Sequence, residues 1–197
     1  MGTNLINKEE IRKAINILKP EGELFEIRVL SGSATYSGYF NDPETAINEL
    51  SKINLSGANV YFTLNRLKEA CISRKQAHRL IKMYGKDPTT GDRDIEDYSF
   101  LFVDIDPVRV SGTSSSQAEL KESNITAKRI YNFLNEMGFE EPIKALSGNG
   151  SHLLYKIDIP NTDENKTIIQ DCLRALDYLY SSFVVKVDVS NFNPGRI

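Results

Sequence analysis

Hydrophobic and polar residues in the second half of the chain follow strand and helix periods in turn. Residues 98–104 read YSFLFVD, a run of bulky apolar side chains that predicts a β-strand. After a Gly/Ser-rich loop, Ser116 and Glu119 have the spacing of a capping box, which marks the beginning of a helix. Apolar residues at helical spacing follow until Gly138, which ends the helix. The pattern therefore predicts one strand followed by one long helix.

Two strands, a second helix and a last strand complete this half of the chain. The strands are expected near 143–146 and 152–159, a helix cap at 161–164, and the last strand in FVVKVDV, residues 183–189. The resulting order, βαββαβ, is the split-βαβ or RRM-like arrangement, in which a four-stranded antiparallel sheet has both helices on one face. We therefore expect an α+β fold with an RRM-like module at residues 96–197.

The first half of the chain has the pattern of a separate α/β module. The segments ELFEIRVL and ANVYFTL have the composition of strands, whereas PETAINELSKI and SRKQAHRLIKMY have apolar positions spaced as in helices. No internal repeat is present. We expect an N-terminal module at residues 1–95 that joins the RRM-like module in one composite core.

Period-two alternation assigns the strand residues of the second half to two faces of the sheet. One face is apolar and suits a covering layer of helices; it comprises Leu101, Val103, Ile105, Leu153, Tyr155, Ile157, Val185, Val187 and Val189. The other face is polar and comprises Asp104, Asp106, His152, Lys156, Lys186 and Asp188. Carboxylates gathered on one surface repel each other, so a positive partner is expected between them. Three converging carboxylates suit two divalent cations roughly 3.5 to 4 Å apart, an arrangement used for phosphoryl transfer.

The composition limits which metals fit such a site. Cys71 and Cys172 are isolated in the sequence, and the chain has only two histidines, His78 and His152, so oxygen atoms must be the main ligands. Oxygen ligands favour Mg²⁺ or Mn²⁺. No apolar run approaches membrane-spanning length, and the N-terminus is too polar for a signal peptide. We therefore expect a cytosolic protein without a membrane partner.

Donors for phosphate groups are expected beside the polar face. The turn SGNGSH contains two glycines, and its backbone N–H groups can form a nest for phosphate oxygens. A hairpin turn without such a role has the same composition. The terminal segment NFNPGRI and a nearby lysine add further donors. The candidate phosphate-binding residues are Ser147, Gly148, Asn149, Gly150, Ser151, His152, Lys186, Asn191 and Arg196.

Basic residues are concentrated in residues 66–86, although the net charge of the whole chain is −3. This segment holds seven basic residues and a single acid, Glu69. A local basic strip can follow the phosphates of a nucleic acid while the rest of the protein remains acidic. The alternative is the solvated face of a helix. The candidate contacts are Arg66, Arg74, Lys75, Arg79 and Lys82.

Three motifs in this order resemble the archaeo-eukaryotic primases, or primase-polymerases. The signature of that family is a strand ending in Asp-x-Asp, a short Ser/His motif and a strand with a third Asp, which here are FVDIDP, SGNGSH and VVKVDV. The resemblance is closest to the phage and plasmid branch, where DIDPVR, a Ser-rich lead into a long helix, SGNGxH and NPxRI occur together. It extends upstream through GYF at 38–40 and VYFTLN at 60–65. One departure is Gly150, which stands where the family has a serine.

The resemblance implies a catalytic core that transfers a nucleotide from an NTP or dNTP to a 3′-hydroxyl on a single-stranded DNA template. Asp104, Asp106 and Asp188 would bind two Mg²⁺ or Mn²⁺ ions, His152 would contact the triphosphate, and segment 66–86 would bind the template. Relatives act in phage, plasmid or other prokaryotic replication and often continue into a helicase-associated region. We therefore expect a cytoplasmic replication enzyme whose C-terminal continuation is missing from this sequence.

Two other functions fit parts of the sequence. DIDPV matches the Asp-x-Asp opening of haloacid-dehalogenase phosphatases, in which the first Asp is a nucleophile and the second an acid. A later Lys and paired acids that such an enzyme needs have no evident counterpart here. The other alternative is a non-catalytic module that binds single-stranded nucleic acid on an RRM-like sheet, with Phe100 and Phe102 stacking on bases.

Overall fold

The computed structural model describes residues 7–32, 34–110 and 112–196, which form two compact units. The first unit comprises the residues up to Asp97 together with Gly195 and Arg196, and the second comprises Tyr98–Pro194. Both contain helices and antiparallel strand pairs, so the α+β fold class is confirmed. No helix among the described residues is long and apolar enough to cross a membrane.

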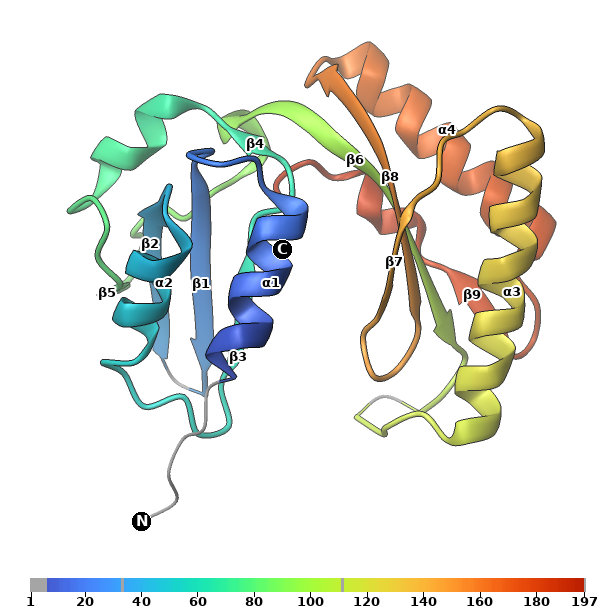
Figure 1. The fold of residues 1–197 in the computed structure, drawn as a ribbon, viewed down its shortest axis with the longest axis horizontal. Helices are drawn as coiled ribbons and strands as arrows, with labels where there is room; N and C mark the ends of the chain where they lie inside the picture. The colour runs from blue at the N-terminus through green and yellow to red at the C-terminus, as the bar shows by residue number, and fades with distance from the viewer. Residues whose placement is uncertain (1–6, 33, 111, 197) are drawn as a thin grey trace. The chain divides into compact units, whose positions relative to one another are not determined.

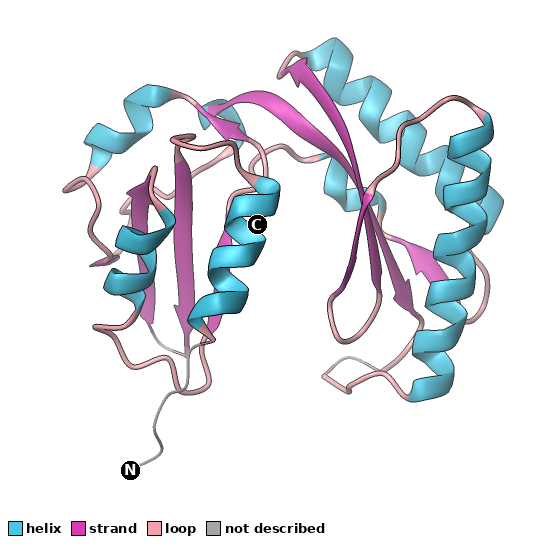
Figure 2. Ribbon diagram, viewed as in Figure 1, coloured by secondary structure: helices cyan, strands magenta, loops and turns pink. Residues whose placement is uncertain are grey.

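The first unit is built on a four-stranded antiparallel sheet with the order β3-β1-β2-β5. Helices α1 and α2 lie on the same face of this sheet (Figure 2) and bury apolar side chains against β1. Each helix begins at a side-chain cap, with Asn7 accepting from the backbone of Glu10 and Asp42 from that of Thr45. The elements are α1 (Lys8–Leu18), β1 (Phe25–Ser31), β2 (Ala34–Phe40), α2 (Pro43–Leu50), β3 (Asn59–Phe62), β4 (Arg66–Leu67), η1 (Glu69–Arg74), β5 (Ile81–Lys82) and η2 (Asp92–Asp94).

A charged network is buried inside the first unit. The Glu26 side chain is fully buried, and its carboxylate accepts hydrogen bonds from Arg28 Nη2 at 2.6 Å, from the Thr90 backbone N–H at 3.2 Å and from the Ser37 hydroxyl. A buried carboxylate costs several kcal/mol of solvation unless it is paired and hydrogen-bonded. Glu26 therefore fastens β2 and the segment around residue 90 to β1.

The second unit has the predicted order βαββαβ. Its strands are arranged as β9-β6-β8-β7, so the last strand lies beside the first (Figure 1). The short strand β4 pairs with the beginning of β6, on the same side as β9. The predicted capping box at Ser116 and Glu119 is present, as is the left-handed Gly138 after the helix. The elements are β6 (Ile95–Pro107), α3 (Gln117–Glu136), β7 (Ile143–Leu146), β8 (Ser151–Pro160), α4 (Asp163–Tyr180), β9 (Val185–Val187) and η3 (Val189–Phe192).

Helices α3 and α4 cover one face of this sheet (Figure 1), and the predicted apolar face is the one they cover. Along β6 the buried Val103 and Ile105 alternate with the partly exposed Asp104 and Asp106. All nine residues assigned to the apolar face belong to the core of this unit or pack against it. The alternation of side chains was therefore sufficient to separate the two faces.

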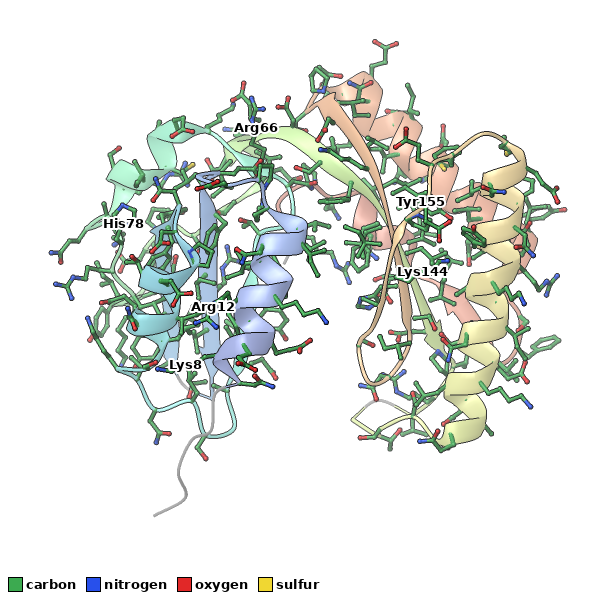
Figure 3. All side chains as sticks on the ribbon, viewed as in Figure 1. Lys8, Arg12, Arg66, His78, Lys144 and Tyr155 are labelled. Atoms are coloured by element: carbon green, nitrogen blue, oxygen red, sulfur yellow. The ribbon has the colours of Figure 1, made fainter. Side chains whose placement is uncertain are left out.

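The predicted helix over SRKQAHRLIKMY is wrong. The 3₁₀ helix η1 ends at Arg74, and β5 follows after a bend. His78, labelled in Figure 3, has a φ of 56°, a left-handed conformation that a helix does not contain. The chain here crosses closely over Gly38, whose added Cβ would clash with the backbone of Arg79. Pairing of β5 with β2 replaces the expected helical hydrogen bonds.

Replacing Glu26 with Ala should lower the free energy of unfolding by about 3–5 kcal/mol, because the partly buried Arg28 would lose its carboxylate partner and Ser37 and Thr90 would lose their acceptor. Urea unfolding measures the change. Glu44→Ala is the matched control, since Glu44 pairs with Arg12 at the surface and its loss should alter stability little. Equal effects of the two substitutions would contradict a structural role for the buried network.

Candidate active site

The pairing of β6 with β9 brings the third aspartate to the acid pair. Lys186 lies directly opposite Asp106, and two residues further along each strand the backbone N–H of Asp188 donates to the carbonyl oxygen of Asp104 at 2.9 Å. Residues directly opposite each other on antiparallel strands have Cβ atoms roughly 4.5–5.5 Å apart on the same face. Three carboxylates from distant parts of the sequence therefore share one surface.

The acidic surface changes the ionisation of Asp106. Partial burial raises the pKa of this carboxyl above its ordinary value, and the charge of Asp104 raises it further. Arg109 and His152 oppose this rise, and the charge of Asp188 adds to it. On balance Asp106 is harder to ionise than an isolated aspartate.

Asp104 has an oxygen atom without a hydrogen-bond donor. Its Oδ1 atom is buried and forms no hydrogen bond, although His152 Nε2 lies 3.3 Å away. The imidazole ring of His152 packs edge-on against Phe102, with 5.0 Å between ring centroids. A buried carboxylate oxygen normally has a partner, and the exceptions are explained by an ordered water, a bound ion, strain or a catalytic role.

The Asp188 side chain is hydrogen-bonded to Ser190. Its Oδ1 atom accepts from the backbone N–H of Ser190 at 2.8 Å and from the Ser190 hydroxyl, and thereby caps η3. Within residues 7–32, 34–110 and 112–196, no three His, Cys, Asp or Glu side chains are close enough to bind one ion. The donors nevertheless suit Mg²⁺ or Mn²⁺, because they are carboxylate oxygens and one of them, on Asp104, is unpartnered. Binding of one ion by all three carboxylates would require their side chains to lie closer together than they do here.

The glycine turn between β7 and β8 lies against the acid pair. A Cβ atom added at Gly150 would clash with Asp106 Oδ1 and would lie 2.5 Å from the carbonyl oxygen of Ile105. Only glycine permits this approach. The sequence predicted that this turn and the Asp-x-Asp motif serve one site, and the structure brings them into contact.

Two N–H groups of the turn are already bound within it. The Ser147 hydroxyl oxygen accepts from the backbone N–H of Gly150 at 2.9 Å and from that of Asn149 at 3.2 Å. These donors were expected to point outward toward phosphate. Phosphate binding by the N–H groups of Asn149 and Gly150 would therefore require the Ser147 hydroxyl to release them.

Hydroxyl groups beneath the turn fix its position relative to β6 and α3. Ser151 is buried, so its side chain faces α3 rather than the acidic surface. Its hydroxyl donates to Asn124 Oδ1 at 2.9 Å and accepts from the buried Ser123 hydroxyl, which also lies 2.7 Å from the carbonyl oxygen of Ile105. Ser151 therefore has a structural contact at the position where a nucleotide contact was expected.

Asn149 joins the turn to the Ser-rich loop before α3. Its side-chain oxygen accepts from the backbone N–H of Ser115 at 3.1 Å, and its carbonyl oxygen accepts from the Ser115 hydroxyl at 2.7 Å. The Ser-rich lead into the helix is thus part of the same substructure as the glycine turn. This contact holds the turn at the end of β6.

The remaining candidate donors differ in their surroundings. Lys186 is exposed on the acidic face opposite Asp106. Asn191, in η3, has a buried side-chain nitrogen without a hydrogen-bond partner, which leaves a donor available. Arg196 belongs to the first unit rather than to the second. Two of these three residues therefore lie in the unit that carries the carboxylates.

The basic segment is largely neutralised by acids of its own unit. Four of the five candidate template contacts form ion pairs: Arg66 with Asp97 at 3.2 Å, Arg74 with Asp94, Lys75 with Asp87 at 3.1 Å and Arg79 with Glu49 at 3.2 Å. Arg66 is labelled in Figure 3. The fifth, Lys82, lies over the ring of the exposed Tyr84, with 5.4 Å between Nζ and the ring centroid. Lys82 and Tyr84 therefore form the part of this segment best placed to contact an anion.

Two residues of the site were not found from the sequence. Arg109 lies 3.8 Å from Asp106 Oδ1 and donates through Nε to the carbonyl oxygen of Thr113 at 3.0 Å. The position of Arg109 in the sequence, three residues after Asp106 at the end of DIDPVR, could have identified it as a residue of the site. Ser123 gave no signal, because a serine within a helix is normally exposed and only the structure shows that this one is buried.

The comparisons with known proteins give no significant match to this chain among protein-family models, curated proteins or solved structures. A function is therefore inferred from the chain's own residues and their geometry.

Replacing Gly150 with Ala should lower the free energy of unfolding by about 1–3 kcal/mol, because the added methyl group must displace Asp106 or the backbone of β6. Gly148→Asn is the matched control in the same turn. Gly148 has a φ of +85° and open space around it, and asparagine tolerates that conformation, so the cost should be below about 1 kcal/mol. Thermal or urea unfolding of both variants checks the prediction. A larger loss of stability in the Gly148 variant than in the Gly150 variant would contradict it.

Proposed function

We propose that this protein is a primase-polymerase that transfers nucleotides from NTPs or dNTPs to a 3′-hydroxyl on a single-stranded DNA template. The observation that carries the proposal is the meeting of three motifs at one surface: Asp188 is paired opposite Asp104, and Gly150 touches Asp106. These motifs, VVKVDV, FVDIDP and SGNGSH, carry the resemblance to the primase family.

The electrostatics of the surface support a reaction of a highly anionic substrate. Asp104 and Asp106 lie on the face of the sheet that α3 and α4 leave uncovered, and Asp188 lies beside Asp104 on the neighbouring strand. Such a face repels a triphosphate unless cations lie between. Two-metal sites use this arrangement to place an attacking oxygen and a leaving oxygen on the same phosphoryl group.

In the proposed reaction the 3′-hydroxyl oxygen of the primer attacks the α-phosphorus, pyrophosphate leaves and the hydroxyl proton passes to solvent. Asp104, Asp106 and Asp188 would hold two Mg²⁺ or Mn²⁺ ions, whose chemistry is to lower the pKa of the hydroxyl and to neutralise charge on the phosphates. The chain itself orients the reactants. Lys186, opposite Asp106, is placed to offset negative charge on the triphosphate.

His152 is proposed to donate to the triphosphate. Its Nε2 atom lies 3.3 Å from Asp104 Oδ1, and its ring is held by Phe102, so the imidazole has a fixed orientation at the edge of the acid pair. A histidine in this position can donate to a phosphate oxygen beside a cation bound by Asp104. Replacement by alanine should mainly weaken nucleotide binding.

The template is proposed to contact Lys82 and Tyr84 in the first unit rather than the whole basic segment. Arg74 and Arg79 already have carboxylate partners, so moving Arg74 to a phosphate would take the ion-pair partner of Asp94. Moving Arg79 would leave Glu49 with Lys52 as its one remaining cation among the described residues. Lys82 beside an exposed aromatic ring combines the two contacts that single-stranded nucleic acid uses, a cation for phosphate and a ring for base stacking.

A non-catalytic nucleic-acid-binding sheet has less support. Phe100 is only 7% exposed and Phe102 packs against His152, so the aromatics expected to stack on bases are engaged within the fold. Carboxylates on the same face would also repel phosphates.

Helicase partnership and a phage, plasmid or other prokaryotic replication context in the cytoplasm remain part of the primase proposal.

Asp104→Asn and Asp106→Asn should each reduce nucleotide incorporation at least a hundredfold, because each removes a carboxylate charge from the proposed metal site. The assay is synthesis on an unprimed single-stranded template and on a primed one, with Mg²⁺ or Mn²⁺ and with NTPs and dNTPs supplied separately. Product lengths distinguish initiation from extension.

Asp158→Asn is the matched control for these variants. Asp158 imitates the third motif in the sequence KIDIP, but it lies on β8, exposed and paired with Lys156 at 3.2 Å. Its φ of 45° is one that asparagine adopts readily, so the variant should fold and remain active. Undiminished synthesis by both acid-pair variants would refute the proposed chemistry.

Lys82→Ala should weaken binding of a single-stranded oligonucleotide and lower the slope of log K against log salt by about 0.7, the value expected for one lost phosphate contact. Anisotropy titrations at several salt concentrations measure both. Lys13→Ala, an exposed change on α1, is the control and should leave the slope unchanged. A slope unaffected by the Lys82 change would exclude Lys82 from the template contact.

A further inference from the structure

A groove runs between α3 and β7 at one edge of the second unit. Two adjoining cavities of about 680 and 460 Å³ form it, and they share Asn124, Lys128 and Leu146 as lining residues. Ala127 and Leu153, both buried, add apolar surface to the lining of the larger cavity. The apolar lining of the groove lies on the side of the sheet that the helices cover, whereas His152, which also lines the larger cavity, is a residue of the acidic face.

The strand that lines this groove is at the end of its sheet. β7 pairs with β8 and, within the described parts of the chain, with no other strand. Lys144, Ala145 and Leu146 are exposed, Leu146 by 67%. An edge strand presents backbone N–H and C=O groups that can pair with an added strand. The exposed Leu146 adds apolar surface at this edge that a paired strand could cover.

The side chains at the groove favour an aliphatic ligand. Leu146 is joined at the lining by Ile125, which is 43% exposed on α3. Apart from His152, Tyr131 is the single aromatic residue that lines the two cavities. The Lys144 ammonium lies 4.0 Å from the centroid of the Tyr131 ring. The groove therefore lacks the several aromatic rings on which nucleic-acid bases stack. Side chains such as Val, Ile or Leu fit this lining better.

The charge of the groove is positive, although the chain as a whole is negative. Three lysines line it, and no Asp or Glu does. Lys144, labelled in Figure 3, already donates to Glu141 at 2.6 Å. Lys121 and Lys128, two turns apart on α3, form no ion pair with any described residue. Two unneutralised cations beside an open strand edge complement an acidic segment.

We propose that this groove binds an extended acidic peptide segment of a partner protein, which adds to β7 as a further strand. Alternate aliphatic side chains of the peptide enter the groove between α3 and β7, and its carboxylates lie near Lys121 and Lys128. Backbone pairing supplies affinity and the groove supplies selectivity, as in other cases of strand addition. This binding goes beyond the function proposed above.

The test uses the full chain and a fluorescein-labelled peptide of eight residues that alternates glutamate and valine. Fluorescence anisotropy should show saturable binding, and hydrogen exchange should show slower exchange of the amides of residues 143–146. A lysine–valine peptide tests the charge requirement and should bind at least tenfold more weakly. A glutamate–valine peptide with alternate N-methylated amides cannot pair as a strand on its methylated edge. Its affinity should also be at least tenfold lower than that of the unmethylated peptide.

The double variant Lys121→Glu, Lys128→Glu should weaken binding of the glutamate–valine peptide at least tenfold. Lys8→Glu, Lys13→Glu is the matched control, because it makes the same change of net charge on exposed positions of α1 and should leave the affinity unchanged. Circular dichroism verifies that both variants fold.

Several outcomes would overturn the proposal. The first two are the absence of saturable peptide binding and an equal loss of peptide affinity in both double variants. The other two are full binding of the N-methylated peptide and unchanged exchange of the β7 amides. An oligonucleotide that binds wild type and is lost only in the Lys121, Lys128 variant, while the peptide does not bind, would assign the groove to nucleic acid instead.

Discussion

The pairing of β9 with β6 is the constraint on which the candidate site depends. It places Asp188 opposite Asp104 on the same face, an arrangement of like charges that is unfavourable by itself. The apolar face of the same two strands maintains it, because Ile105 and Val187 are buried in the core. A slip of one residue would expose these side chains and bury the carboxylates. Core packing therefore holds the acids together against their repulsion, which is the condition for binding cations there.

Buried hydroxyl groups connect this acidic surface to the helix behind it. Ser123 reaches the carbonyl oxygen of Ile105 on β6 and the hydroxyl of Ser151 at the beginning of β8. The glycine turn, which ends at Gly150, is thereby held beside Asp106 from the helical side of the sheet. A site that must position phosphates within a fraction of an ångström gains from such support, because exposed turns are otherwise the least ordered parts of a fold.

The sequence predicted the second unit better than the first for a physical reason. Strand alternation and helix caps are local signals, and together they determined the order βαββαβ and the two faces of the sheet. The basic segment gave a misleading signal, since the spacing of its apolar residues resembled a helix. Its conformation depends on distant partners: Asp97 for Arg66, Glu49 for Arg79, and the β2 backbone for β5. Contacts of this kind, like the burial of Ser123, leave no mark in a local window of sequence.

The hairpin of β7 and β8 joins the two candidate binding regions of the second unit. Its turn touches Asp106 at Gly150, and its first strand lines the groove with Leu146, the residue directly before Ser147. The Ser147 hydroxyl holds the backbone of the turn, so Leu146 and the turn are parts of one short, hydrogen-bonded segment. A strand added to β7 would restrict this segment without touching a carboxylate. The turn has one arrangement with the Ser147 hydrogen bonds and another without them, and a strand added to β7 would favour the arrangement that it fits better. Occupancy of the groove is therefore linked to the donors beside the acid pair.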